Sequence, residues 1–596
     1  MYQTFDVTAR PEQGPPRLKA LRGVLADEGL DGFLVPRADA HQGEYVAARD
    51  ARLAWLTGFT GSAGFCVVLR DRAGVFIDGR YRTQVKAQVA AEFTPVPWPE
   101  TSMAAWLRDA LPAGGRVGFD PWLHTVEQIA QTTKALAGSG ITLIETANLV
   151  DRIWDDQPAP PSQPAKIHPL EFAGESHEHK RARLAKTLAE AGERAAVITL
   201  PDSLCWLLNI RGADIERNPV VHAFALFHAD GSVDLFADLR KFEGMAAHLG
   251  PEVRLAATEK FLPALDGLDG PVRIDAGTAP QIVANRLGDR AVHGKDPCAL
   301  PKARKNAAEI AGAAEAHLRD GAAMVEMLCW LDAQPAGSLS ETQVVRKLEE
   351  FRRRDNALQD ISFETIAGTG PNGAIMHYRV TEETDATLED GHLIVIDSGG
   401  QYLDGTTDIT RTIPIGTPPQ EACAAFTRVL AGLIAMSRLR WPKGLAGCHI
   451  EAIGRMPLWL AGQDFDHGLG HGVGAYLSVH EGPQRLSRVS DVPLEAGMIL
   501  SNEPGYYREG AFGIRLENLL VAEKAPNLPG GDDHRAMLHW RTLAFVPIDR
   551  RLVVPELLDP DARTWLNDYH AEVVQKIGPR VTPPAKEWLD NATAPI

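Results

Sequence analysis

Two acidic hairpins in the last third of this 596-residue chain constrain its fold more than any other feature. In the first, a β-branched apolar run ends at Asp397, and an alternating pattern resumes beyond a turn sequence and contains Asp408. This pattern predicts two antiparallel strands joined by a turn. We expect the chain to turn around Tyr402 and Leu403, which would place Asp397 and Asp408 nearly opposite each other.

The second hairpin repeats this arrangement with glutamates. Glu503 and Glu517 are equally distant from Gly510, where we expect the turn. Like charges directly opposite each other across a strand pair are destabilising. Two such pairs in one chain therefore predict a compensating cation, and hence a metal site.

A fifth candidate ligand, His471, lies in the segment His467-Gly-Leu-Gly-His471-Gly-Val-Gly474. Glycines on both sides of it allow the backbone to approach a buried ion closely. Four carboxylates balance the charge of two divalent cations, and oxygen-rich ligation favours Mn²⁺, although Co²⁺ or Zn²⁺ would also fit. Two neighbouring metal ions are suited to hydrolysis, because they activate water and stabilise the developing charge.

An internal duplication organises the first half of the chain. Three positions on a helical stripe recur at one constant offset: Leu21, Leu25 and Gly29 correspond to Leu184, Leu188 and Gly192. Each copy continues with an apolar strand and then with a strand, a turn and a second strand. The duplication predicts two similar mixed α/β domains.

A proline-rich linker and a long helix mark further boundaries. The segment Asp155–Pro164 contains four prolines, which cannot sustain a helix or an inner strand. An alanine-rich helix is expected from Lys302 to Leu331, and the tail should contain two short helical pieces around Trp565 and Trp588. The predicted parts are residues 1–154, a linker at 155–168, residues 169–300, a catalytic domain at 301–546 and a C-terminal extension at 547–596.

The acidic composition bears on partners and location. There are 61 lysines and arginines against 78 aspartates and glutamates, a net charge of −17, which disfavours nucleic acid or an anionic membrane as the main partner. The six cysteines are scattered without a Cys-x-x-Cys pair, as expected of reduced thiols. The N-terminal segment resembles no signal peptide, and no apolar stretch approaches the length of a membrane span. The cytoplasm is the predicted location.

The order Asp, Asp, His, Glu, Glu, with its spacings of eleven and fourteen residues, resembles that of the pita-bread metallopeptidases. Within them the chain is most similar to the long, three-domain cytosolic aminopeptidase P family, the Xaa-Pro aminopeptidases. The similarity extends to Asp39-Ala-His-Gln-Gly-Glu-Tyr45, Gly61-Ser-Ala-Gly64, Asp78-Gly-Arg-Tyr81 and Pro371-Asn-Gly-Ala-Ile-Met-His377-Tyr378. It implies an α/β (α+β) fold, with two similar creatinase-like N-terminal domains followed by a pita-bread catalytic domain.

The resemblance also implies a role for individual residues. Asp408 and Glu517 would bridge two metal ions, Asp397 would bind one of them, and His471 and Glu503 would bind the other. Three histidines would be catalytic, namely His377, His467 and His480. The residues expected to contact substrate are Arg80, His377, His480 and Arg515; strand alternation also places Arg515 on the face of Glu517, where it could support a carboxylate.

The activity implied by the resemblance is removal of the N-terminal residue from peptides with proline in the second position. A metal-bridging hydroxide would attack the Xaa-Pro amide, and either Glu503 or a histidine would carry the proton to the prolyl nitrogen. Family members suggest a homodimer, for which Trp459 is a candidate interface anchor or else a core residue.

Three alternatives remain on sequence grounds. A prolidase, which acts only on dipeptides, would share the ligands but typically lacks the second N-terminal domain and the long tail. A metal-free pseudoenzyme of the same fold would lack several of the five ligands. The segment Asp397-Ser398-Gly-Gly400 imitates the nucleophile motif of trypsin-like proteases, although Asp397 is better used as a metal ligand.

Overall fold

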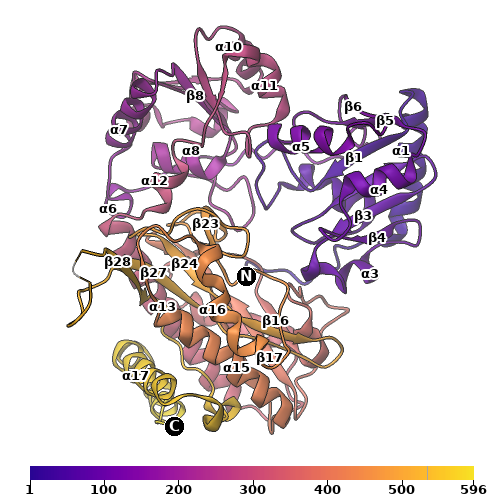
Figure 1. The fold of residues 1–596 in the computed structure, drawn as a ribbon. Helices are drawn as coiled ribbons and strands as arrows, with labels where there is room; N and C mark the ends of the chain where they lie inside the picture. The colour runs from indigo at the N-terminus through magenta and orange to yellow at the C-terminus, as the bar shows by residue number, and fades with distance from the viewer. Residues whose placement is uncertain (533) are drawn as a thin grey trace. The chain divides into compact units, whose positions relative to one another are not determined.

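The computed structural model describes residues 1–532 and 534–596, and the chain divides into two compact units. Unit 1 comprises residues 1–7, 171–174 and 300–596, and unit 2 comprises residues 8–170 and 175–299. Figure 1 shows the elements of each unit. Among the described residues, every helix is too short or too polar to cross a membrane.

Unit 2 contains two six-stranded sheets with the same strand order. The first sheet has the order β4-β3-β2-β1-β5-β6, and its strands are β1 (Gly32–Pro36), β2 (Phe65–Leu69), β3 (Ala73–Ile77), β4 (Thr94–Pro97), β5 (Gly115–Phe119) and β6 (Ile141–Glu145). The second has the order β12-β11-β10-β8-β13-β14, and its strands are β8 (Ala195–Ile198), β10 (Phe224–His228), β11 (Val233–Phe236), β12 (Val253–Ala256), β13 (Val272–Ile274) and β14 (Ala291–His293). Corresponding strand pairs are also parallel or antiparallel in the same way.

The helix that precedes each central strand carries the repeated sequence pattern. Helix α1 (Gly14–Asp27) buries Leu21 and Leu25, and helix α7 (His177–Glu190) buries the corresponding leucines. After each helix a glycine adopts a positive φ, 62° at Gly29 and 73° at Gly192. This left-handed conformation ends the helix and is favourable only for glycine or a few polar residues. The predicted duplication is therefore confirmed.

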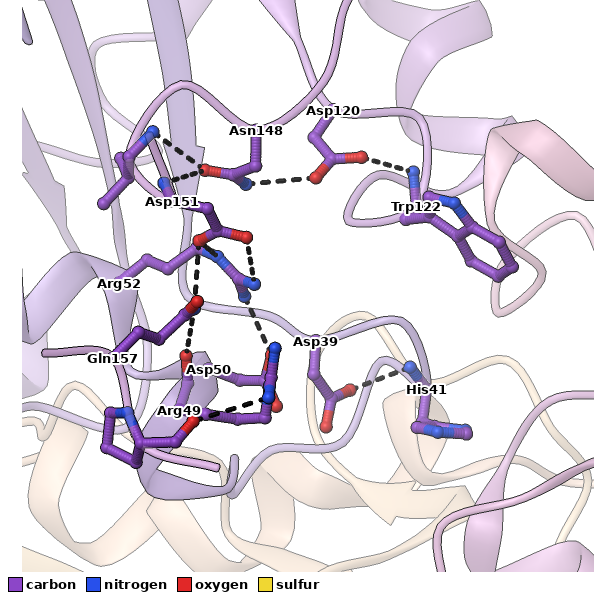
Figure 2. A network of polar contacts seen from close by, with 12 residues as sticks. Asp39, His41, Arg49, Asp50, Arg52, Asp120, Trp122, Asn148, Asp151 and Gln157 are labelled. Carbon is purple, nitrogen blue, oxygen red and sulfur yellow. Dashed lines mark hydrogen bonds and ion pairs between the residues drawn. The ribbon is translucent and has the colours of Figure 1, made fainter. Parts of the chain in front are cut away.

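A polar network holds the start of the proline-rich linker to Arg49 and Asp151 of unit 2 (Figure 2). Gln157 donates hydrogen bonds to Asp151 Oδ1 (3.0 Å) and to Arg49 O (2.9 Å). Asp151 in turn accepts two hydrogen bonds from the buried guanidinium of Arg52, at 2.6 and 2.9 Å, and Arg52 also contacts Asp50. Residues 157–165 form neither helix nor strand, as their prolines require.

Unit 1 contains helices packed against several small sheets and one larger sheet (Figure 1). The larger sheet has the order β21-β28-β27-β24-β22-β23, and its strands are β21 (Arg440–Pro442), β22 (Gly470–Gly472), β23 (Glu481–Leu486), β24 (Ile499–Asn502), β27 (Asn518–Lys524) and β28 (Met537–Thr542). The main helices are α13 (Ala307–Asp332), α14 (Glu341–Arg352), α15 (Gln420–Ser437) and α16 (Gly447–Trp459). Buried side chains of α15, α16, β24 and β27 form one core, which also contains Phe512, Ile514 and Leu516 of the second acidic hairpin.

The first acidic hairpin turns one position later than expected. Its outer strands β17 (Leu393–Ser398) and β20 (Ile409–Pro414) pair Asp397 with Thr410, and the inner strands β18 (Gly400–Tyr402) and β19 (Gly405–Thr406) pair Tyr402 with Gly405. The turn is thus Leu403–Asp404, and Asp408 is not directly opposite Asp397. Gly405 belongs to a strand because it packs against α13, where a Cβ would lie 2.9 Å from Ala313 Cα.

The second acidic hairpin turns at the predicted position. Strand β24 pairs with β27, and β25 (Gly505–Arg508) pairs with β26 (Phe512–Arg515). Both pairs have the same register, with Asn502 opposite Asn518 and Gly505 opposite Arg515. The centre of that register is Gly510, whose φ is 76°. Glu503 and Glu517 are therefore opposite each other across the hairpin.

The C-terminal tail contains α17 (Pro560–Ile577) and α18 (Pro583–Ala592), and α17 packs against α13 and α15. The expectation of two short helical pieces is wrong for α17, which is 18 residues long because Asp559 caps it and Leu566, Tyr569 and Val573 bury one face. The fully buried Arg411 of β20 connects this tail to the acidic hairpins. It donates hydrogen bonds to Tyr569 Oη (2.8 Å), Val546 O (2.7 Å) and Glu517 O (2.6 Å).

Candidate metal centre

All five predicted metal ligands converge in unit 1. Their oxygen and nitrogen atoms form overlapping groups in which every ligand atom lies within 4.8 Å of the others. The three groups are Asp397, Asp408 and Glu517; His471, Glu503 and Glu517; and Asp408, His471 and His480. The structure therefore adds His480 to the cluster, a residue that we expected to contact substrate.

Four of the five ligand candidates lie at or beside the end of a strand. Asp397 is near the end of β17, Asp408 precedes β20, Glu503 follows β24 and Glu517 precedes β27, while His471 is the middle residue of β22. The glycines beside His471 are required by close backbone approaches. A Cβ would lie 2.0 Å from Ser501 O at Gly470 and 2.3 Å from Glu481 O at Gly472.

Burial and mutual repulsion make the cluster unfavourable without cations. Asp408 and Glu517 are 3% and 1% exposed. Burial raises the pKa of both carboxyl groups well above the ordinary range, and the neighbouring acids raise it further. Asp397 Oδ1, Asp408 Oδ1 and Glu517 Oε1 are buried and accept no hydrogen bond from the residues that the structure describes. Four carboxylates, three of them with a free buried oxygen atom, and one imidazole fit two hard or borderline divalent ions.

Hydrogen bonds orient the remaining ligand atoms. Thr410 Oγ1 donates to Glu517 Oε2 at 2.9 Å, and Ser501 Oγ donates to Glu503 Oε1 at 3.2 Å. His471 Nδ1 lies 2.9 Å from Gly472 O, so this nitrogen carries the proton and donates. His471 Nε2 then faces Asp408 Oδ2 (3.4 Å) and Glu503 Oε1 (3.6 Å) with its lone pair available to a metal ion.

A chain of hydrogen bonds runs from the cluster to His467. Arg515 donates to Asp397 Oδ2 and to Tyr507 Oη, both at 2.6 Å, and Tyr507 Oη lies 2.9 Å from His467 Nε2. Burial raises the pKa of Tyr507 to about 12, so its hydroxyl stays neutral and donates to His467. Sequence reasoning missed Tyr507, although it lies diagonally across β25–β26 from Arg515.

The other predicted site residues have distinct surroundings. The ring of His480 lies 4.2 Å from that of His471 in an edge-to-face arrangement. His377 is half-buried, and its neighbour Tyr378 donates a hydrogen bond to the buried Glu341 at 2.8 Å. Arg80 belongs to unit 2, where its guanidinium makes two hydrogen bonds with Asp78 at 3.0 and 2.7 Å. The roles of these residues toward substrate remain predictions.

The protease-like serine is unsuited to nucleophilic attack. Ser398 is fully buried, and its Oγ accepts a hydrogen bond from Arg352 Nη2 at 3.0 Å. A nucleophile must reach its substrate and be activated by a neighbouring base. The serine-protease alternative is therefore not supported by the structure.

Comparisons with known proteins cover nearly the whole chain. Residues 311–524 match metallopeptidase family M24, and residues 536–596 match the C-terminal region of that peptidase family. Residues 17–153 and 156–309 each match the creatinase/prolidase N-terminal domain. Aminopeptidase P2 of Arabidopsis thaliana is 36% identical over 97% of this chain and 88% of its own length. The probable Xaa-Pro aminopeptidase P of Coccidioides posadasii is 35% identical over 100% of this chain and 95% of its own length.

A solved structure of an X-prolyl aminopeptidase is also similar to nearly the whole chain. The X-prolyl aminopeptidase of Caenorhabditis elegans, described as a cytosolic enzyme with a di-nuclear active site, is 31% identical and has a TM-score of 0.94. That match covers 98% of this chain and 100% of the other. The prolidase of Pyrococcus horikoshii, at 23% identity and a TM-score of 0.50, covers only 62% of this chain and shares the fold.

Proposed function

The chain belongs to metallopeptidase family M24, and we propose that it is an Xaa-Pro aminopeptidase, which removes the N-terminal residue from peptides with proline in the second position. The observation that carries this proposal is the cluster of five ligands within a chain that is similar over its full length to aminopeptidases P. The di-nuclear enzyme of C. elegans, which matches 98% of the chain, supports the same activity.

The five ligands would hold two divalent metal ions, and we assign Mn²⁺ to the site because four of the five ligands are carboxylates. Asp408, Glu517 and His471 each belong to two of the three ligand groups, and of these only the carboxylates have two oxygen atoms with which they could bind both ions. Asp397 would bind one ion, and His471 and Glu503 the other. When bound, the ions supply an activated water at neutral pH and stabilise the negative charge that develops on the scissile carbonyl.

The chain's own residues position these groups and the substrate. Arg515 holds Asp397 Oδ2 and leaves Oδ1 available for ligation. His480, beside His471, would orient the scissile amide, and His377 and His467 would line the same pocket. Glu503, whose side chain is 19% exposed, is more accessible than Asp397 or Asp408 and is our choice for carrying the proton to the prolyl nitrogen.

The activity is tested with three matched peptides in the presence of Mn²⁺: Arg-Pro-Pro, Arg-Ala-Ala and the dipeptide Arg-Pro. We expect release of arginine from Arg-Pro-Pro at a much higher kcat/KM than from the other two. Comparable cleavage of Arg-Ala-Ala would refute proline specificity, and preference for Arg-Pro would indicate a prolidase. A chain that binds no divalent ion and gains nothing from added Mn²⁺ would be a pseudoenzyme.

A homodimer is the assembly that we propose. Met456, Trp459 and Leu460 at the end of α16 are 51%, 43% and 83% exposed, and Arg488 lies over the Trp459 ring. Contiguous exposed apolar residues of this kind mark interaction surfaces. Trp459→Glu should convert the dimer to a monomer in sedimentation velocity, whereas an unchanged sedimentation coefficient would place the interface elsewhere.

We also propose the cytoplasm as the location of the enzyme. The C. elegans relative is described as cytosolic, and all six cysteines of this chain carry free thiols, as reducing conditions favour. Fractionation of the source cells with an antibody to the chain tests this location. Recovery with the membrane or secreted fraction would contradict it.

A further inference from the structure

A buried ion cluster lies directly beside the histidine pair of the metal centre. Glu481 follows His480 in the chain, and its carboxylate contacts the ammonium groups of Lys302, at 3.0 Å, and of Lys305. The three side chains are at most 2% exposed. Lys305 Nζ also donates to Lys302 O at 2.9 Å, which fixes the two lysines relative to each other.

Stability alone does not explain this cluster. Two ammonium groups and one carboxylate are buried together in this cluster, and desolvation of such ions is unfavourable. Apolar side chains of similar volume often stabilise a core as well or better. The best attested use of buried ions is to hold one part of a chain in a single register.

The peptide backbone transmits the position of Glu481 to both histidines. In the β22–β23 ladder, Glu481 pairs with Gly472, whereas the adjacent His471 pairs with Arg485. The register of the ladder therefore shifts between His471 and Gly472. Regular strand pairing therefore does not determine where His480 lies. The contacts with Lys302 and Lys305 add a side-chain constraint on Glu481, the residue that follows His480.

The two lysines are themselves fixed to a ligand-bearing strand. Lys302 belongs to α12 (Ala299–Ala303), and Lys305 lies between α12 and α13, where Lys305 N donates to Gly497 O at 3.0 Å. Arg304 forms a β-bridge with Met498, immediately before β24. Since β24 leads to Glu503, the cluster connects the segment of one metal ligand to the segment of His480.

We propose that Glu481, held by Lys302 and Lys305, is a positioning residue that sets the place of His480 beside the metal centre. The inference rests on the proposed aminopeptidase function, in which His480 contacts the substrate. Glu481 acts through His480 and does not itself touch the peptide.

Glu481→Asp tests this proposal, because it keeps the charge and withdraws the carboxylate by one methylene. We expect kcat on Arg-Pro-Pro to fall roughly 10- to 100-fold, as for residues that orient metal-site side chains, with a much smaller change in KM. In a His480→Ala background the same substitution should lower kcat by less than about twofold. An equal loss in both backgrounds would overturn the proposal, because the effect would not pass through His480.

A spectroscopic measurement separates this inference from the proposed activity. In Co²⁺-loaded protein the paramagnetically shifted His480 imidazole resonance, assigned by its loss in His480→Ala, should move in Glu481→Asp. An unchanged resonance would refute the positioning role whether or not the wild-type chain cleaves Arg-Pro-Pro. Failure of the wild type to cleave while the resonance moves would refute only the activity.

Lys302→Met provides a second variant in case Glu481→Asp fails to fold. It leaves the Lys305–Glu481 pair with no net charge, and it should shift the His480 resonance and lower kcat in the same direction. The matched control is Lys524→Met at the exposed end of β27, which should change neither. If Lys302→Met behaves like this control, Lys302 has no part in positioning His480.

Discussion

Asp408→Asn should have opposite effects on the free energy of unfolding of the metal-free and the metal-loaded protein. Without cations, Asp397, Asp408 and Glu517 place three carboxylates in a buried cluster. Removing one charge relieves their repulsion, and the new amide can donate to a neighbouring carboxylate. With metal bound, the same change would replace the carboxylate that we propose to bind both ions by a neutral amide.

The separation of the carboxylates sets the size of the effect. Two negative charges no more than 4.8 Å apart repel each other by at least about 3.5 kcal/mol at an effective dielectric constant of about 20. The protein avoids part of this cost because burial and the neighbouring acids raise the pKa of Asp408 and Glu517, so that protons are retained. We therefore expect Asp408→Asn to stabilise the metal-free protein by about 1 to 3 kcal/mol near pH 8.

The pH dependence has a definite sign. Because the pKa of Asp408 is higher in the folded than in the unfolded protein, the folded state binds the proton more tightly. Stability of the metal-free wild type is thus lost as pH rises from the unfolded value of an aspartate, about 4, through the raised folded value. The asparagine variant should lack this contribution, and its advantage should shrink toward acidic pH.

Urea denaturation measured by circular dichroism, with chelator or with excess Mn²⁺, tests both predictions. In the metal-loaded protein, a hundredfold loss of metal affinity would remove about 2.7 kcal/mol of stabilisation. Asp491→Asn, at an exposed position, is the control and should change either state by less than about 0.5 kcal/mol. If Asp408→Asn destabilises the metal-free protein as much as the loaded one, the carboxylates are not under electrostatic strain and the reasoning is wrong.

Three other substitutions test the surroundings of the centre. Arg515→Met should weaken metal binding roughly 10- to 100-fold, measured as metal content after dialysis, because Asp397 loses the partner that orients it; full metal content would contradict this role. Tyr507→Phe should leave metal content unchanged but lower kcat, since the link from Arg515 to His467 is broken; unchanged kcat would show that the link is dispensable. Burial raises the pKa of Glu341 to about 7, above its unfolded value. The free energy of unfolding should therefore fall as pH rises from about 4.5 to about 7. Glu341→Gln should reduce this fall by about 2 to 3 kcal/mol. Parallel stability curves of the two proteins would exclude titration of Glu341 in this range.

The sequence predicted the second hairpin better than the first for a physical reason. At Gly510 the turn is free of other contacts, so local preference for a positive φ decides its position. The turn of the first hairpin was expected at Tyr402 and Leu403, midway between the aspartates, but the observed turn lies one position later, and Gly405 belongs to a strand that passes close to α13. Local sequence does not show whether a glycine is needed for a positive φ in a turn or for a close approach to another element.

The four carboxylate ligand candidates were accessible to sequence reasoning because their spacing is set within single hairpins, and His471 was accessible because glycines flank it. Tyr507 and Glu481 were not, since their significance depends on contacts with residues elsewhere in the fold, His467 and Lys302 among them. The duplicated sheets were visible because a helix-ending glycine and its leucines recur together. The exact strand order came only from the structure.

The contacts of Arg411 have a consequence for the biosynthesis of the enzyme. Its guanidinium holds the backbone carbonyl of Glu517 and the hydroxyl of Tyr569, which is translated after every metal ligand. A nascent chain that has exposed Glu517 but not yet the segment from Val546 to Tyr569 would lack Val546 O, Pro547 O and Tyr569 Oη, three of the acceptors of Arg411. We therefore expect the centre to be completed only when this segment has left the ribosome, so that acquisition of metal is among the last steps of maturation.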